Sequence, residues 1–351
     1  MNFSRRTFIK SLPLTGASTT TILANPLPNS VLESASNADS LHPRNGSNHE
    51  FEGTDHKPQK FKLGLVTYNI AAKWDLKTIL KICKSVGIAA VECRTTHAHG
   101  VEISCTSEKR KEIKKQFQDS GIIFWGCGSV CEFHSPDEKI VRKNVEECKR
   151  FVDLVAEIGG KGVKVRPNGL PKNVPVEKTL AQIGSALSEC GRAAASKGIE
   201  IWLEVHGGGT QIPNNVKIIM DHCDSKSVGL TWNSNPTDIK NGSIAESFQL
   251  LSKWIKSCHI NELYKDRQKL YPYQQLFQLL REIDYDRYTM IEVGKTPPDA
   301  SSGEELLKYY KALWEILCLS PSPTSSRSSS LPSSPAFPPS KKTTSRNLGE
   351  L

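Results

Sequence analysis

Residues 175–206 read PVEKTLAQIGSALSECGRAAASKGIEIWLEVH, and this stretch indicates the fold. Apolar residues recur at helical spacing up to Lys197, and Gly198 then supplies a typical helix end. Residues 199–203 form a short apolar run of the kind found in buried strands. The run ends at Glu204, and a carboxylate directly after a buried strand must be paired, hydrogen-bonded or metal-bound.

The same alternation of helix and strand extends to both sides of this stretch. Eight runs whose starts lie roughly 30 residues apart are expected to be strands: 63–68, 90–93, 122–125, 162–165, 199–203, 228–231, 257–260 and 288–291. Strands that alternate with helices favour a parallel sheet, and eight such units predict an α/β fold, the closed (β/α)8 TIM barrel. A doubly wound open sheet is the alternative, but residues 68–71 lack the Gly-rich phosphate turn that it needs.

The two ends of the chain differ from this middle. Residues 1–24 contain the heptamer SRRTFIK before a mildly apolar stretch, which resembles a twin-arginine export signal and predicts a periplasmic or otherwise exported protein. Residues 25–60 are expected to be a disordered linker, 61–318 the barrel domain, and 319–351 a disordered Ser/Pro-rich tail. No uncharged apolar run approaches the roughly 20 residues of a membrane span, so no stable membrane insertion is expected after export.

Composition limits the choice of partners. The formal net charge is +9, but Lys and Arg are spread along the chain without a block of like charge, so no nucleic-acid partner is expected. The diffuse charge fits a small carbohydrate or anionic ligand, and the sequence leaves a homo-oligomer open. Several of the ten cysteines lie inside apolar runs, which favours buried thiols over structural disulfides.

Polar residues end the late strands. Glu204, His259 and Glu292 follow the apolar residues of the fifth, seventh and eighth expected strands. In a barrel, groups at the C-terminal strand ends face the active site. Two carboxylates and a histidine suit a divalent cation with nitrogen and oxygen ligands, and the two carboxylates also suit proton transfer.

Three short motifs, LEVHG at 203–207, CHI at 258–260 and IEVG at 291–294, resemble the xylose-isomerase-like TIM barrels, a family of sugar isomerases and epimerases and their relatives. The resemblance implies one divalent metal ion (Mn, Mg, Co or Zn), bound by Glu204, Asn233, His259 and Glu292. Asn233 stands where the family usually has Asp, and an amide brings no charge. Three interpretations follow: a weaker metal, compensation by Glu262 or Asp238, or no metal.

The remaining strand-end residues are expected to contact the substrate. These are Lys164, Arg166, His206, Arg94 and Trp232, and Trp125 is a further aromatic that could stack on a sugar or belong to the core. The resulting hypothesis is a metal-assisted isomerase or epimerase of a sugar or sugar derivative, with Glu204 and Glu292 exchanging a proton through an enediolate. The alternatives are a lyase or dehydratase acting on a keto-sugar, and a sugar-binding barrel without catalysis.

Overall fold

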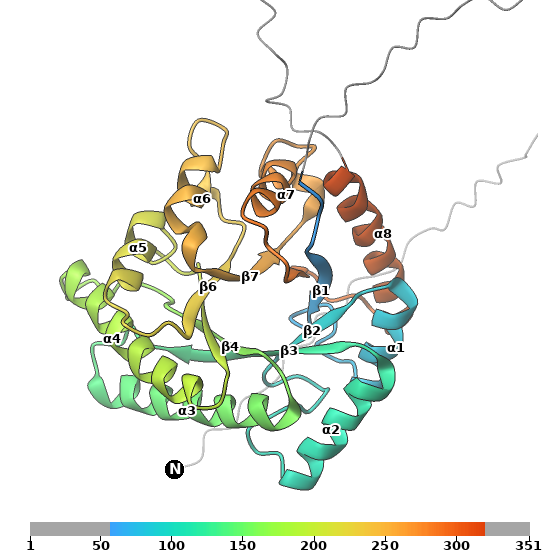
Figure 1. The fold of residues 1–351 in the computed structure, drawn as a ribbon, viewed down its shortest axis with the longest axis horizontal. Coiled ribbons are helices and arrows are strands. Elements are labelled where there is room, and N and C mark those ends of the chain that lie inside the picture. Colours follow the sequence, from blue (N-terminus) through green and yellow to red (C-terminus); the bar gives the residue numbers. More distant parts are fainter. Residues whose placement is uncertain (1–56, 320–351) are drawn as a thin grey trace, which may run out of the picture. The chain divides into compact units, whose positions relative to one another are not determined.

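The computed structural model describes residues 57–319 and shows a closed barrel of parallel strands, as expected (Figure 1). The strands are β1 (Lys62–Val66), β2 (Ala90–Arg94), β3 (Ile123–Glu132), β4 (Gly162–Arg166), β5 (Glu200–Glu204), β6 (Val228–Trp232), β7 (Ile255–Ile260) and β8 (Tyr288–Ile291). Each strand pairs with the next, and β8 closes the barrel by pairing with β1, for example Ile291 with Leu65. The sheet therefore has no free edge.

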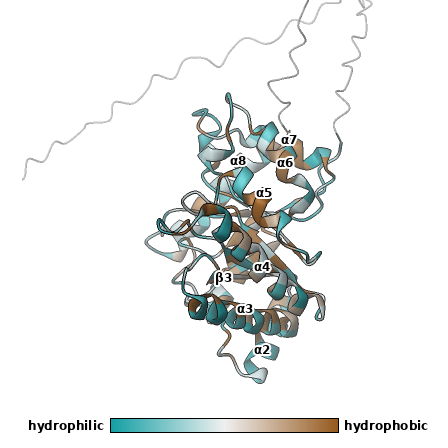
Figure 2. Ribbon diagram, turned by 90° about the vertical axis from the view of Figure 1, so that its left-hand side faces the viewer, coloured by the Kyte–Doolittle hydropathy of each residue, from teal (hydrophilic) through white to brown (hydrophobic). Residues whose placement is uncertain are grey.

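A helix follows each strand and lies on the outside of the barrel (Figure 1). The helices are α1 (Leu76–Val86), α2 (Ser107–Ser120), α3 (Glu138–Ile158), α4 (Val176–Ala195), α5 (Pro213–Asp221), α6 (Ala245–Leu251), α7 (Tyr273–Glu282) and α8 (Ala300–Leu319). The side of α3 that faces outward in Figure 2 is largely hydrophilic, while its buried residues pack on the sheet. Helix α3 ends at Gly159 with φ 96°, one residue before the glycine expected from the sequence.

Apolar and aromatic side chains fill the lower part of the barrel interior. Val66, Ala90, Trp125, Trp202 and Met290 form this floor cluster, in which the two indole rings stack with centroids 4.8 Å apart. A TIM barrel is a packed core of this kind and not a pore. Trp125 is therefore a core residue, and sugar stacking by Trp125 is excluded.

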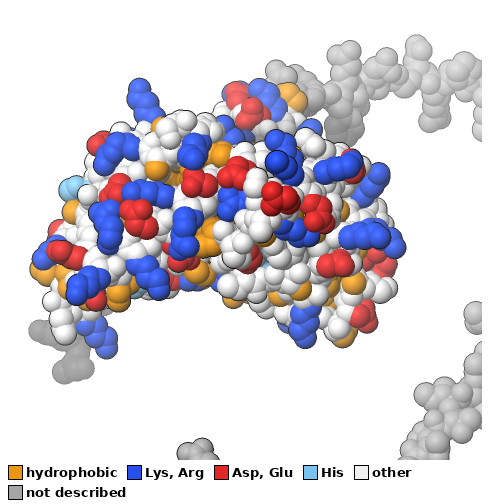
Figure 3. Space-filling model, turned by 90° about the horizontal axis from the view of Figure 1, so that it is seen from below, with side chains coloured by type: hydrophobic (Ala, Val, Ile, Leu, Met, Phe, Trp, Pro, Cys, Tyr) orange, Lys and Arg blue, Asp and Glu red, His pale blue; other side chains and the backbone are white. Residues whose placement is uncertain are grey.

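Four further features concern the surface charges, the helices, the cysteines and the chain ends. Lys and Arg lie interspersed with Asp and Glu on the face shown in Figure 3. Every helix between residues 57 and 319 is too short or too polar to cross a bilayer. All ten cysteines are free thiols. The predicted export signal and most of the linker and tail lie outside the described residues, while Lys57 and Lys60 each pair with Asp284 at 2.8 Å.

Candidate active site

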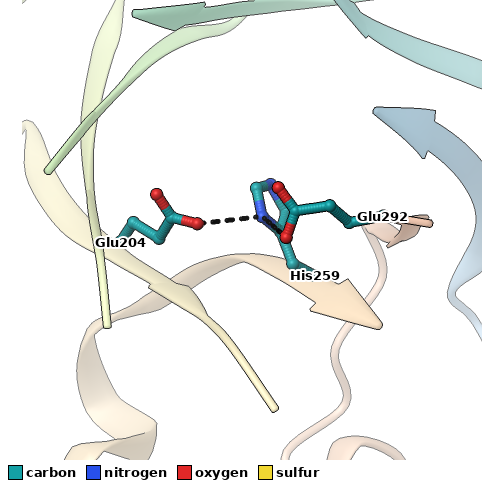
Figure 4. A group of neighbouring side chains, drawn as sticks. All are labelled: Glu204, His259 and Glu292. Atoms are coloured by element: carbon teal, nitrogen blue, oxygen red, sulfur yellow. Dashed lines mark ion pairs between the residues drawn. The ribbon is translucent and has the colours of Figure 1, made fainter. Parts of the chain in front are cut away.

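Glu204, His259 and Glu292 meet at the C-terminal end of the barrel. Glu204 is the last residue of β5, His259 lies in β7, and Glu292 follows β8 directly. The imidazole Nδ1 of His259 lies 3.5 Å from Glu204 Oε1 and 3.5 Å from Glu292 Oε2. Figure 4 shows the two carboxylates converging on this nitrogen from different strands. The three predicted residues therefore form one cluster.

Lys164 on β4 neutralises one side of the cluster. Its Nζ lies 2.8 Å from Glu204 Oε2, and both side chains are almost fully buried. Asn233, which follows β6, donates its amide N–H to the other oxygen, Oε1, at 3.3 Å. Burial raises the pKa of Glu204, but Lys164 and His259 outweigh it and hold that pKa well below its usual value. Glu204 is therefore a fixed anion.

A third carboxylate lies behind His259. Glu92 on β2 is fully buried, and its Oε2 accepts a hydrogen bond from His259 Nε2 at 3.2 Å. Burial lowers the pKa of His259, but the surrounding carboxylates, Glu92 first, raise it well above its usual value. The sequence prediction did not assign Glu92. The signal was its position two residues from both Ala90 and Arg94, which places all three on the inner face of β2.

A polar cavity of about 330 Å³ opens above the cluster. Residues at or after the ends of seven strands, all but β3, line it: Tyr68, Arg94, Lys164, Arg166, Glu204, His206, Gln211, Asn233, Asn235, Asn261, Glu262, Glu292, Val293 and Gly294. The structure thus brings Lys164, Arg166, His206 and Arg94 to the cavity, and their role as substrate contacts stays a prediction. The prediction that Trp232 contacts the substrate is wrong. This side chain is fully buried, its Nε1–H donates to Tyr271 Oη at 3.0 Å, and it does not reach the cavity.

The cluster fits a divalent cation. Ligand atoms of Glu204, His259 and Glu292 all lie within 4.8 Å of one another. Nδ1 of His259 is buried without a hydrogen-bond partner, while Nε2 is held by Glu92. A histidine ligand held at its second nitrogen by a carboxylate is the usual arrangement in metal sites. The donor set combines imidazole nitrogen with carboxylate oxygen, as such sites require.

Glu262 and Asp238 could compensate for the missing aspartate at position 233 only if they lay beside the metal ligands. Both lie outside the cluster of Glu204, His259 and Glu292. Glu262 lines the cavity, but it pairs with Lys265 at 2.8 Å. Asp238 is buried, and its Oδ2 accepts hydrogen bonds from Asn235 N–H and the Tyr271 hydroxyl at 2.9 Å each. Asn233 Oδ1 accepts from Ser234 N–H at 3.0 Å, so its amide is oriented by protein groups.

The protein is a closed parallel barrel with buried carboxylates and a histidine at its C-terminal mouth. It therefore belongs to the class of TIM barrels that carry a site at their strand ends. Within that class, residues 80–313 match the model of the xylose isomerase-like TIM barrel family, and the chain belongs to this family.

Solved structures share the fold. A D-psicose 3-epimerase crystallised with D-fructose shares 15% identity at a TM-score of 0.61, covering 74% of this chain and 99% of its own. The IolI protein with a bound zinc atom shares 19% at a TM-score of 0.61, covering 74% and 98%. The 3-keto-D-glucoside 4-epimerase from E. coli shares 16% at a TM-score of 0.56, covering 74% and 99%. At these identities the likeness shows the fold. No curated protein matches the chain.

Proposed function

We propose that this protein is an isomerase or epimerase that moves a proton next to the carbonyl of a sugar or sugar derivative. The observation that carries the proposal is the placement of Glu204 and Glu292 on either side of His259, at the base of a polar cavity. Carboxylates that reach a bound substrate from different strands can remove a proton with one group and return it with the other. The solved relatives named as sugar epimerases support this reaction class.

The two carboxylates differ in their freedom to act. Both oxygens of Glu204 contact protein groups, Lys164 Nζ and the Asn233 amide. Glu292 has 16% of its side chain exposed, against 3% for Glu204, and it lines the cavity without a lysine or arginine partner in the described chain. We therefore assign the first proton abstraction to Glu292. Glu204 is ionised before reaction, so the proton that it returns to the substrate comes from Lys164, whose Nζ lies 2.8 Å from Glu204 Oε2. Glu292 keeps the abstracted proton until it exchanges with solvent.

A divalent cation belongs to this proposal, with Glu204, His259 and Glu292 as its protein ligands. When bound, it supplies Lewis-acid polarisation of the substrate carbonyl. His259 must lose its Nδ1 proton before that nitrogen can act as a ligand, so binding of the cation is expected to weaken as pH falls. Asn233 contributes an amide in place of a carboxylate, so the cation is expected to be held weakly.

Solvent deuterium exchange tests the function directly. Purified protein is assayed for metal content and then incubated in D₂O with ketoses and aldoses, and deuterium at the carbon beside the carbonyl is measured by NMR. We expect exchange in the wild type and a loss of about 10²-fold or more in Glu292→Gln, the range of general acid–base catalysis. Glu204→Gln should reduce both exchange and bound metal.

The folded fraction of each variant must be measured as well. Glu204→Gln leaves Lys164 buried without its counter-charge, and breaking such a pair costs about 3–5 kcal/mol. Glu200→Gln is the matched control, because Glu200 lies at the opposite end of β5 and pairs with Arg287 at 2.6 Å. Wild-type protein without exchange on any sugar, or unchanged exchange in Glu292→Gln, contradicts the proposal.

We also propose that the protein acts outside the cytoplasm. The support is the SRRTFIK heptamer at residues 4–10, which lies outside the described residues. Cell fractionation is the check: protein that stays full-length in the cytoplasm contradicts export.

A further inference from the structure

The mouth of the cavity carries two arginines that the proton-transfer cluster does not use. Arg94 lies two residues beyond Glu92 on β2, and Arg166 lies two residues beyond Lys164 on β4. Residues two apart on a strand point to the same face and are about 6.6 Å apart. Both guanidinium groups therefore lie one step nearer the mouth than Glu92 and Lys164, and both line the cavity.

Arg94 has no ion-pair partner in the described part of the chain. Its Nη1–H donates to the backbone oxygen of Thr95 at 2.7 Å, and its guanidinium lies 5.7 Å from the centroid of the Tyr68 ring. It forms no ion pair with any carboxylate of residues 57–319. Burial and the nearby Arg166 lower the pKa of Arg94, and Tyr68, Glu204 and Glu102 offset only part of this lowering. A half-buried cation of this kind favours an anion beside it.

Arg166 is held in place and still has an unused donor. It pairs with Glu132, which also accepts a hydrogen bond from the Asn168 side chain at 2.7 Å. Nε of Arg166 is nevertheless buried without a hydrogen-bond partner, and so is Nδ1 of His206. Buried polar atoms without a partner are rare in native proteins. The side chains of Arg94, Arg166 and His206 all line the same cavity.

The backbone of β3 makes room for the Glu92 carboxylate, which lies one step below Arg94 on β2. Gly128 is the register partner of Arg94 on one side and of Lys164 on the other. A Cβ at Gly128 would lie 2.9 Å from Glu92 Oε1 and 3.6 Å from Arg94 Cδ. The absent side chain thus leaves space for Glu92, while the distance to Arg94 is one of ordinary contact.

We propose that Arg94, with Arg166 beside it, binds an anionic group at the far end of the substrate. The substrate class is then a sugar acid or a sugar phosphate and not a neutral sugar. This inference rests on the proposed function for the placement of the carbonyl end, which lies at Glu204 and Glu292. Carboxylate and phosphate share the chemistry that a guanidinium fork recognises, namely paired anionic oxygens.

The test is a binding comparison among three matched ligands: D-fructose, its C6 carboxylate D-fructuronate, and its C6 phosphate. Dissociation constants are measured by calorimetry on the protein as purified and again with a chelator, because both anions also bind metal ions. We expect at least one anion to bind about tenfold or more tightly than fructose, as for a charge-assisted hydrogen bond. The tighter of the two anions identifies the substrate as an acid or a phosphate.

Arg94→Gln should abolish this preference, and Arg94→Lys should keep part of it, because charge remains but the fork is lost. Arg192→Gln is the control, since Arg192 is an exposed arginine on α4 that pairs with Asp224. Melting temperatures of all variants establish that they are folded. The ratio of anion to neutral affinity is the readout, and a purely structural role for Arg94 would leave it unchanged.

Equal binding of anions and fructose, no binding of any of the three, or a preference that survives Arg94→Gln overturns the anionic subsite. Exchange assays on the same ligands separate this result from the proposed function. Exchange on fructose with no anion preference removes the subsite and leaves the isomerase. An Arg94-dependent anion preference without exchange on any ligand removes the isomerase and leaves the subsite.

Discussion

His259 shows how much of this site depends on one buried contact. Its Nε2 is held by Glu92 at 3.2 Å, and this directs Nδ1 toward Glu204 and Glu292. Without a partner at Nε2, the ring could rotate, and the neutral imidazole could keep its one proton on Nδ1, so the nitrogen that faces the carboxylates would not be free to bind a cation. Glu92 is therefore a positioning residue: it touches neither the cavity nor a reacting atom.

Replacing Glu92 by Gln should weaken divalent-cation binding about tenfold, and Glu92→Ala about 100-fold, the range for partners behind a metal ligand. Glutamine retains an acceptor for His259 Nε2 but not the charge. Titration of Mn²⁺ against a chelating dye measures the affinity. Glu200→Gln serves as the control, since this buried β5 carboxylate lies far along the strand from the cluster. An affinity in Glu92→Gln equal to the wild type would assign Glu92 to packing alone.

The sequence identifies the residues at the strand ends but not their contacts. Glu204 and Glu292 could be predicted because each directly follows an apolar run, and His259 because it lies near the end of an expected strand. The contact between Glu92 and His259 joins residues 167 positions apart and depends on how the barrel closes. Trp232 fits a sugar platform or a core equally well by composition. Its burial beside Phe248 is decided by the position of α6.

At the scale of elements, the strands carry the site in alternate residues. On β5, Trp202 belongs to the floor cluster and Glu204 to the cavity, and on β8 Met290 and Glu292 repeat this order. The positions of the strands could be predicted because glycines and capping residues mark where the neighbouring helices begin and end. The length of β3 could not, since it runs from Ile123 to Glu132, well beyond the expected four residues. Its extension depends on pairing between Glu132 and Arg166, which is a tertiary contact.

Gly162, the first residue of β4, sets how closely the floor cluster packs. A Cβ at this position would lie 2.4 Å from the Trp202 ring, which is itself stacked on Trp125. Gly162→Ala should therefore lower the free energy of unfolding by about 1–3 kcal/mol, the cost of overpacking a core. Urea denaturation measures the change. Gly208→Ala is the control, because a Cβ there meets no atom within 4 Å. Equal stability of the two variants would show that the floor cluster rearranges to accept the added methyl group.

At the scale of the whole molecule, buried polar groups outside the cavity connect stability to pH. Asp238 is the clearest case. It lies in η1 (Pro236–Asp238), and its Oδ1 is buried without a hydrogen-bond partner. Burial raises the pKa of Asp238 to about 7, although hydrogen bonds from Asn235 and Tyr271 oppose the rise. In the unfolded chain this carboxyl returns to its ordinary value of 3.8, so folding retains a proton between these two values.

The stability contributed by the protonated Asp238 is fully present below about pH 4 and is lost as pH rises toward 7, because the folded state alone binds the proton in this window. Asp238→Asn cannot titrate, so its unfolding free energy should rise relative to the wild type by at most about 1.4 kcal/mol per pH unit between pH 5 and 7. Urea denaturation at pH 5, 6, 7 and 8 measures this difference. Asp284→Asn is the matched control, because Lys57 and Lys60 lower the pKa of Asp284 to about 2, below the tested range. A difference between Asp238→Asn and wild type that stays constant from pH 5 to 8 would mean that Asp238 is ionised in the folded protein throughout.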